Sequence, residues 1–339
     1  MKRKAKRQKK ILIISVIVLF ISLTAGYSAF NTNIKLKAKG SIVETSEKCF
    51  TVIDNGDGTG TIEDYDKLCG TKVKIPNKIN GLTITKLADI PVDASTTQGF
   101  VRKGITHVWF PDTLTYIGDM QFFHNNITEI NIPDSVTYIG QQTFSGNKIK
   151  GELKLPSRIK TIENVAFYGN DITKVNIPNT VTYLGSGAFT RNSLTGEDKY
   201  IYGINKDGSI DYTTLNSYAS KDTDNIKIPK NVELIENWAF GGMTIKYIEI
   251  PSNVKTLGGG AFSMTDLASI KLNDGLEYIG DRCFAASTLT EITIPASVQA
   301  IQETAFTNSN LKTINIKQKE NKISGSPWEA SNAQINWLG

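Results

Sequence analysis

The sequence predicts a repeat solenoid, because one phrase of 22 residues recurs along most of the chain. It reads ITEINIPDSVTYIGQQTFSGNK from Ile127 and LTEITIPASVQAIQETAFTNSN from Leu289, and each copy contains an isoleucine-proline pair. Such prolines lie 22 or 23 residues apart from Pro111 to Pro178, and 51 residues then separate Pro178 from Pro229. A period in the twenties is typical of a solenoid, in which each unit buries its apolar side only by stacking on its neighbours.

A basic segment and an apolar stretch precede the repeats. Residues 1–10 contain seven basic side chains and no acidic one, and residues 11–30 contain no charge. An apolar helix of about 20 residues crosses a bilayer core, and the positive-inside rule keeps a preceding basic segment in the cytoplasm. We therefore expect Ile11–Phe30 to be a transmembrane signal anchor, with the chain from residue 31 onward outside the cell. A cleaved signal peptide is the alternative, because Thr24-Ala25-Gly26 offers small residues for a cut, and the repeats would then be secreted.

The net charge of the exported part argues against nucleic acid as a partner. Removing residues 1–10 changes the formal charge of the chain from +5 to −2. No broad basic surface of the kind that nucleic-acid binding needs is left.

Residues 31–72 are expected to form a β-hairpin that caps the first coil. Two β-prone runs flank Asp54-Asn55-Gly56-Asp57-Gly58, which is typical of a tight turn. This turn lacks the ligand pattern of an EF-hand calcium loop. Cys49 and Cys69 bracket the hairpin and are predicted to pair in an oxidising compartment, whereas Cys283 is expected to be a small buried residue. Residues 73–104 are then interpreted as a degenerate first repeat with a loop.

Residues 105–339 are expected to be regular repeats, interrupted by an insertion at residues 193–224. Ile130 and Ile132 are two residues apart, so they share one face of a short strand that the following proline ends. The segment before each repeat phenylalanine is expected to form a short helical turn. The phenylalanines should then stack as a core ladder, with Trp328 in the equivalent place of the last repeat. They are Phe122, Phe144, Phe167, Phe189, Phe240, Phe262, Phe284 and Phe306.

The phrase L-x-x-I-x-I-P-x-x-V-x-x-I-G-x-x-A-F resembles the BspA-like bacterial leucine-rich repeat family. The resemblance covers about two-thirds of the chain. It implies a curved, right-handed leucine-rich repeat array with a parallel β-sheet of short strands, in a secreted or surface-attached bacterial protein. Members of the family are associated with adhesion, and the family has no shared catalytic set. No sorting tail like that of the wall-anchored members is seen here, so attachment would rest on Ile11–Phe30.

The outward side chains of the predicted strands form the first candidate partner-binding surface. They are polar and of mixed sign, with few aromatic rings, which favours a protein partner over a glycan. Solubility alone is the alternative explanation of such a surface. The candidates for partner contacts are His107, Trp109, Glu129, Lys174, Tyr247 and Glu249.

The insertion at residues 193–224 is the second candidate, because it is rich in tyrosine. Its candidate contact residues are Tyr200, Tyr202 and Tyr212. A tyrosine-rich excursion from a rigid scaffold is a common place for binding. The alternative is that these rings pack against the flank of the solenoid.

Enzyme function is not predicted. The two histidines, His107 and His124, lack the spacing of a metal site, and no phosphate-binding loop or nucleophile elbow is found. We expect no cofactor and no metal. The predicted function is a membrane-anchored extracellular scaffold that binds proteins, with an adhesive role. A passive spacer of the cell envelope and an envelope polysaccharide binder are the alternatives.

Overall fold

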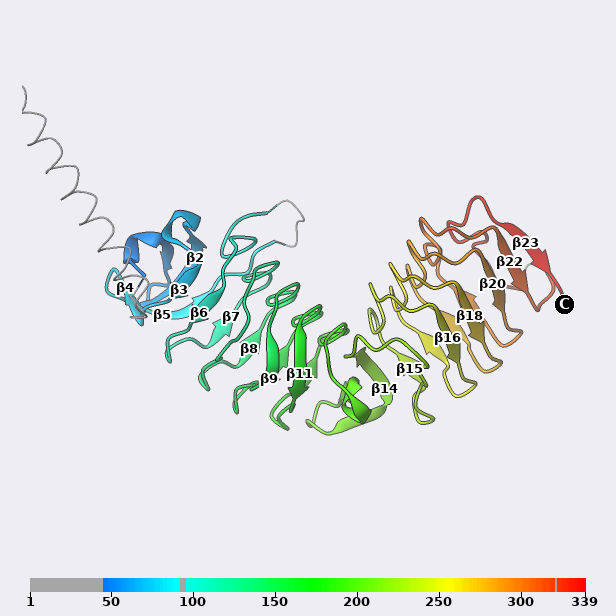
Figure 1. Ribbon diagram of the computed structural model, residues 1–339, viewed down its shortest axis with the longest axis horizontal. Coiled ribbons are helices and arrows are strands. Elements are labelled where there is room, and N and C mark those ends of the chain that lie inside the picture. Colours follow the sequence, from blue (N-terminus) through cyan, green and yellow to red (C-terminus); the bar gives the residue numbers. More distant parts are fainter. Residues whose placement is uncertain (1–44, 92–95, 321) are drawn as a thin grey trace, which may run out of the picture. The chain divides into compact units, whose positions relative to one another are not determined.

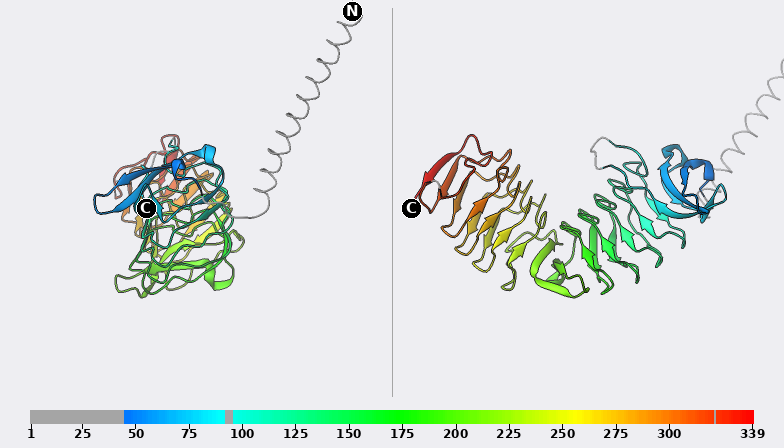
Figure 2. Two further views of the ribbon diagram at one scale, coloured as in Figure 1. Left: turned by 90° about the vertical axis from the view of Figure 1, so that its left-hand side faces the viewer. Right: turned by 180° about the vertical axis from the view of Figure 1, so that it is seen from behind.

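The computed structural model of the chain describes residues 45–91, 96–320 and 322–339. Residues 45–339 form one compact unit whose coils are stacked in chain order (Figures 1 and 2). The predicted basic segment, the apolar segment at residues 11–30 and the first part of the cap lie outside the described residues. In the part that is described, no helix is long and apolar enough to cross a membrane.

An antiparallel hairpin stands at the N-terminal end of the coils. Strands β1 (Phe50–Asp54) and β2 (Thr59–Tyr65) are joined by the predicted turn, in which Gly56 and Gly58 both have a φ of 81°. Such a φ favours glycine. Strand β2 pairs in parallel with β5 (Leu82–Leu87), which also pairs with the short β4 (Lys78–Ile79), so the hairpin covers the first coil.

Cys49 and Cys69 are joined by a disulfide bond beneath this hairpin, with their Cα atoms 6.0 Å apart. Each cysteine ends a short 3₁₀ helix, Glu47–Cys49 and Lys67–Cys69. Cys283, by contrast, is a fully buried free thiol in the core, and burial raises its pKa. It therefore packs as a small apolar side chain, as the sequence predicts.

The isoleucine-x-isoleucine segments form one side of the coils, here called the strand face. Its strands pair in parallel, but they form four short sheets and not one continuous sheet. Residues 128–132 and the insertion interrupt the pairing at two places, and a third break separates β18 from β20. The four sheets are β3 (Lys72–Lys74) with β6 (His107–Trp109); β9 (Lys150–Leu153) with β11 (Asp171–Val175); β16 (Tyr247–Ile250) with β18 (Ser269–Leu272); and β20 (Glu291–Ile294), β22 (Thr313–Ile316) and β23 (Gln334–Trp337).

A second parallel ladder, which the sequence interpretation did not predict, makes the longest sheets of the molecule. Each coil contributes two residues to it, an outer one and a buried Ile or Leu, such as Ile139 in β8. Its short strands are β7 (Tyr116–Ile117), β8 (Tyr138–Ile139), β10 (Thr161–Ile162) and β12 (Tyr183–Leu184), and beyond the insertion β15 (Leu234–Ile235), β17 (Thr256–Leu257), β19 (Tyr278–Ile279) and β21 (Ala300–Ile301).

The predicted short helical turns around the phenylalanines are wrong. Within the described residues the only helical segments are three short 3₁₀ turns, and none of them contains a repeat phenylalanine. In the coil around Phe144 the N–H groups of Gln142, Phe144 and Gly146 donate to carbonyls of the next coil, 2.8–3.0 Å away. Both flanking residues, Gln142 and Gly146, have positive φ. Alternate N–H groups therefore point to the neighbouring coil, and a helix cannot form.

The phenylalanine ladder is confirmed. Rings of successive coils are stacked with centroids 4.9–5.8 Å apart, and the ladder begins one coil earlier than predicted, at Phe100. Trp328 closes the ladder edge-on against Phe306, at 6.3 Å. All of these side chains have less than 2% of their surface exposed, so they form the axis of the core.

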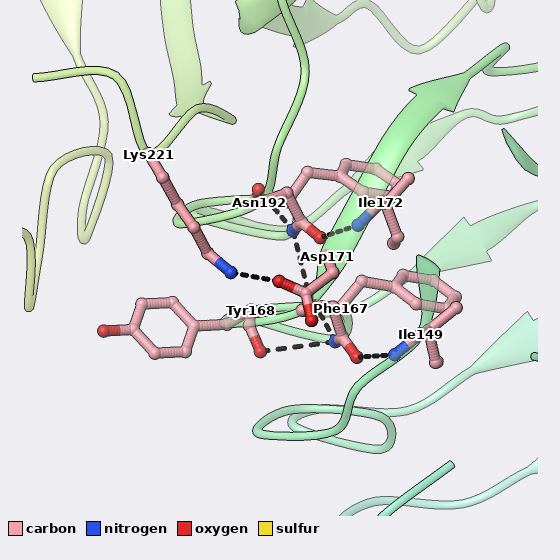
Figure 3. Close-up of polar contacts among 9 residues, drawn as sticks. Ile149, Phe167, Tyr168, Asp171, Ile172, Asn192 and Lys221 are labelled. Atoms are coloured by element: carbon pink, nitrogen blue, oxygen red, sulfur yellow. Dashed lines mark hydrogen bonds and ion pairs between the residues drawn. The ribbon is translucent and has the colours of Figure 1, made fainter. Parts of the chain in front are cut away.

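Buried asparagines form another ladder beside the phenylalanines, three residues after each ring. In the close-up of Figure 3, Asn192 accepts from the backbone N–H of Ile172 at 3.1 Å and donates to the carbonyl of Phe167 at 2.9 Å. Each asparagine thus joins backbone groups of neighbouring coils that no strand ladder satisfies. The members are Asn125, Asn147, Asn170 and Asn192.

The insertion supplies a shortened coil of its own. After the 3₁₀ turn Gly196–Lys199, strands β13 (Tyr200–Ile204) and β14 (Ile210–Tyr218) form an antiparallel hairpin, and β14 pairs in parallel with β15 in the second ladder. Tyr218 takes the place of a phenylalanine, because its ring stacks on Phe240 at 5.2 Å and is fully buried. The hairpin is therefore part of the solenoid.

Candidate partner-binding surface

The candidate contact residues on the strand face lie in different sheets. His107 and Trp109 lie on β6, whereas Tyr247 and Glu249 lie on β16. On β6, the rings of His107 and Trp109 are half-buried and stacked, with centroids 5.7 Å apart. Glu129 is exposed on residues 128–132, which form no strand. The three residues therefore point outward, but they do not enclose a pocket.

Charged side chains of neighbouring coils pair with one another on this face. Lys174 contacts Glu152 at 3.2 Å, and both side chains are about half exposed. Exposed ion pairs of this kind contribute about 0–1 kcal/mol each. Further along the face, Asn315 donates to Glu291 at 2.7 Å and Asn336 donates to Asn315 at 2.9 Å. Several polar side chains of this face are therefore already paired between neighbouring coils.

Tyr247 and Glu249 line a groove of about 620 Å³ at the start of the C-terminal half of the strand face. Tyr247 is 52% exposed on β16. The groove is lined by Thr223, Asp224, Asn225, Ile226, Lys227, Ile228, Lys246, Tyr247, Glu249 and Pro251. The segment 225–228 is joined to β16 only by an isolated bridge between Lys227 and Glu249. The groove thus lies where the pairing of the strand face is interrupted.

Glu249 is ionised and held in place at the edge of this groove. Its carboxylate accepts hydrogen bonds from Lys271 and Asn273, each at 2.8 Å, and these bonds hold its pKa below the usual value. The same contact raises the pKa of Lys271. The groove accordingly presents a carboxylate paired with Lys271 beside an exposed aromatic ring, an arrangement that suits a polar protein segment.

The candidate tyrosines of the insertion have three different environments. Tyr200 is 7% exposed, and its hydroxyl donates to the carbonyl of Lys227 at 2.7 Å, so its ring is not available to a partner. Tyr202 is half-buried and lies edge-on against Tyr212, with ring centroids 5.1 Å apart, while Tyr212 is 56% exposed. Only Tyr212 is therefore openly available, and Tyr200 instead supports the groove from behind through Lys227.

A polar junction holds the insertion between the two halves of the array. Figure 3 shows the ion pair between Lys221 and Asp171. On the same junction, the hydroxyl of Tyr168 donates to the carbonyl of Gly241 at 3.1 Å and Ser186 donates to Glu236 at 2.8 Å. The two halves are thus joined by hydrogen bonds at the place where Tyr218 begins the second run of stacked rings.

The sequence predicts two residues of the groove, Tyr247 and Glu249, as partner contacts, but it does not predict the groove as a whole. Its signal is the interval of 51 residues between Pro178 and Pro229, which marks the interruption of the strand face. No group of three or more histidine, cysteine or acidic side chains that could hold a metal ion is found within the described ranges.

Comparisons with known proteins place the chain in a family of repeat proteins. The family described as BspA type leucine rich repeat region matches residues 96–195 and 213–334, with six copies of the repeat. No curated protein matches the chain.

Several solved structures align with most of this chain. The pneumococcal vaccine antigen PcpA is 19% identical, with 88% of this chain and 98% of that chain aligned at a TM-score of 0.52. A leucine-rich repeat protein from Bacteroides ovatus is 25% identical over 88% of this chain and 71% of its own, with a TM-score of 0.46. A leucine rich cell surface protein from Faecalibacterium prausnitzii is 21% identical over 88% and 96%, also at 0.46. The likeness to PcpA supports the fold, and the match over both halves of the array shows that the chain belongs to the BspA type leucine-rich repeat family.

Proposed function

We propose that the chain is a bacterial cell-surface scaffold whose strand face binds an extracellular protein in an adhesive role. The observation that carries the proposal is the groove around Tyr247, where an exposed ring lies beside the Glu249 carboxylate, which Lys271 and Asn273 hold in place. Exposed aromatic rings are enriched in protein interfaces, and rigid solenoids commonly bind through such surfaces. No catalytic step is part of this proposal.

Attachment to the cell is proposed to rest on residues 11–30. The support is the sequence alone: seven basic residues followed by 20 uncharged ones. Cell fractionation tests it. An anchored chain stays with the membrane after a high-salt wash, and a cleaved chain is found in the medium with a new N-terminus beyond Ala25.

A binding experiment with whole cells tests the groove. Bacteria that display the full chain would be titrated against immobilised matrix proteins and mucins, with cells lacking the chain as background. We expect saturable binding to a protein that Tyr247→Ala weakens at least about tenfold, the size of effect that loss of an interface aromatic ring produces. Ile53→Ala, which removes a comparably exposed apolar side chain from β1, serves as the matched control.

The variants also separate the other candidates on the chain. A loss with Tyr212→Ala but not with Tyr247→Ala would move the site to the insertion. Binding to envelope polysaccharide in place of protein would favour the glycan alternative. If correctly displayed and folded chain bound none of these surfaces, the passive spacer would be the better interpretation, and the self-paired charges of the strand face would then be its soluble exterior.

A further inference from the structure

A row of tyrosines lies on the second ladder, on strands that the proposed strand-face site does not use. Tyr116, Tyr138 and Tyr183 are the outer residues of β7, β8 and β12, and the residue after each of them is buried. Carboxylates accompany this row, and we call the whole set the tyrosine–carboxylate row. Its acidic members are Asp89, Asp119, Glu163 and Glu236.

The rings of the row are ordered by contacts within the fold. Tyr116 and Tyr138 stack with centroids 4.4 Å apart and planes 3° from parallel. The hydroxyl of Tyr116 donates to Asp89 at 2.8 Å, and Tyr183 is 46% exposed. Because the first two rings cover each other, they present edges and hydroxyls to solvent. A sugar ring cannot lie flat on them, which argues against a glycan.

The carboxylates of the row carry charge that the fold does not neutralise. Within residues 45–91, 96–320 and 322–339, no lysine or arginine forms an ion pair with any of the four. The nearest basic residues along the ladder, Lys86 and Lys160, are exposed and form no ion pair with another residue of the described ranges. This contrasts with the strand face, where Glu152 and Glu249 each contact a lysine.

Burial and mutual repulsion make the negative charges of the row unfavourable as long as no cation is near. Burial raises the pKa of Asp119, and the neighbouring Asp89 raises it further. Burial also raises the pKa of Glu163, and the charge of Asp119 raises it further. Burial and the charges of Glu163 and Asp119 together raise the pKa of Tyr138 to about 12. A cation brought to the row would offset the repulsion among these carboxylates and favour their ionised forms.

We propose that the tyrosine–carboxylate row is a second interaction surface, which binds a lysine- or arginine-rich extended segment of a protein partner. The carboxylates supply charge-assisted hydrogen bonds, and the exposed face of Tyr183 supplies a cation–π contact. Asp119 and Glu163 come from the coils before and after Tyr138 and are the central contacts. This surface is independent of the groove around Tyr247, so either can fail without the other.

A titration with nona-arginine peptide tests the proposal. The full chain in detergent micelles would be compared with the double variant Asp119→Asn/Glu163→Gln by fluorescence anisotropy. We expect the double variant to bind at least about tenfold more weakly, and wild-type affinity to fall steeply between about 50 and 300 mM salt. Asp119 Oδ1 accepts the backbone N–H of Gln141 at 2.7 Å. The amide oxygen that Asp119→Asn introduces can still accept this bond, so the fold should be retained.

The matched control removes two carboxylates elsewhere. Glu277→Gln/Glu291→Gln changes the net charge equally but lies outside the row, and it should bind the peptide as wild type does. Equal weakening by both double variants would overturn the proposal, because it would show a response to net charge only. A saturable rise in melting temperature with calcium chloride, lost in Asp119→Asn/Glu163→Gln and without peptide binding, would overturn it in favour of a cation site.

Discussion

The coils before the insertion and the coils after it bury the same aromatic ladder but treat the adjacent polar groups differently. Three residues after the ring, the first set has asparagine four times in succession, from Asn125 to Asn192. The second set has Met243, Thr265, Ser287 and Ser309 at the same place. The hydroxyls of Ser287 and Ser309 are buried and have no hydrogen-bond partner within the described residues.

The difference shows which part of the repeat is essential and which is exchangeable. The ring fills the axis of every coil, so its size is constrained by packing on both sides. The residue three positions later only has to satisfy neighbouring backbone groups, and asparagine satisfies three at once: Asn170 accepts from Ile149 and donates to Phe144 and Phe167. We therefore expect the N-terminal coils to resist local opening more strongly than the C-terminal ones.

The largest effect should come from the shared ladder, and it should be the same in both sets. Phe144→Ala and Phe262→Ala each remove a fully buried ring that is stacked on both sides. Each should lower the free energy of unfolding by about 3–5 kcal/mol, measured by urea denaturation. A cost in one set more than twice that in the other would mean that the two halves do not share one kind of core.

The asparagine ladder should produce the next largest effect, in the first set only. Asn170→Ala leaves the N–H of Ile149 without the partner that it contacts at 3.0 Å, while the carbonyls of Phe144 and Phe167 keep bonds from Asn147 and Asn192. We expect a cost of about 2–3 kcal/mol, because a buried group left unpaired costs about 1–3 kcal/mol. Hydrogen exchange should show faster exchange at the Ile149 amide, and unchanged protection there would contradict this account.

These two features also show what the sequence could predict. The ladder of rings and its closing Trp328 follow directly from the 22-residue period, since a periodic buried phenylalanine has only its equivalents to stack on. Asn125, Asn147, Asn170 and Asn192 were equally visible at a constant distance of three residues from each ring. By themselves these asparagines predict only turns, because asparagine is typical of turns and its bonds to other coils appear only once the coils are stacked.

The turns and the candidate groove could not be derived in the same way. The expected helical turns are absent because their N–H groups bond to the next coil, a contact that no local propensity describes. Tyr247 and Glu249 were correctly placed on the outer side of a strand, since side chains alternate. The groove beside them depends on how the insertion interrupts the pairing, and Tyr200, expected as a surface candidate, was drawn into the core by its bond to Lys227.

Removing an unsatisfied hydroxyl from the second set should have the opposite sign to the asparagine effect. Ser287→Ala keeps the packing and removes a buried oxygen that has no partner. We expect stability to rise by as much as about 1 kcal/mol, because the desolvation cost of the hydroxyl disappears. The readout is the urea midpoint at constant slope. A loss of stability would indicate that Ser287 has a hydrogen bond in solution, such as one to an internal water.

The smallest effects concern the left-handed position two residues after each ring, where both sets contain glycine in some coils and other residues in the rest. Gly169 occupies it in the first set with a φ of 68°, and Ala286 occupies it in the second with a φ of 52°. A left-handed φ costs a residue with a Cβ about 1–2 kcal/mol, which is partly offset by the greater freedom of glycine in the unfolded chain. Ala286→Gly should therefore stabilise, and Gly169→Ala should destabilise, each by about 0.5–1 kcal/mol.

Each substitution serves as the control for the other, because neither site has neighbouring atoms that would clash with or pack tightly against a methyl group. A Cβ at residue 169 would meet no atom closer than 3.9 Å, so a clash cannot explain a loss there. Ala286 is exposed, so its methyl group contributes little burial. Differential scanning calorimetry of both variants should give shifts in melting temperature of opposite sign. Shifts of the same sign would mean that the backbone of the turn relaxes when its side chain changes, and that the left-handed conformation is then a consequence of the sequence and not of the stacking.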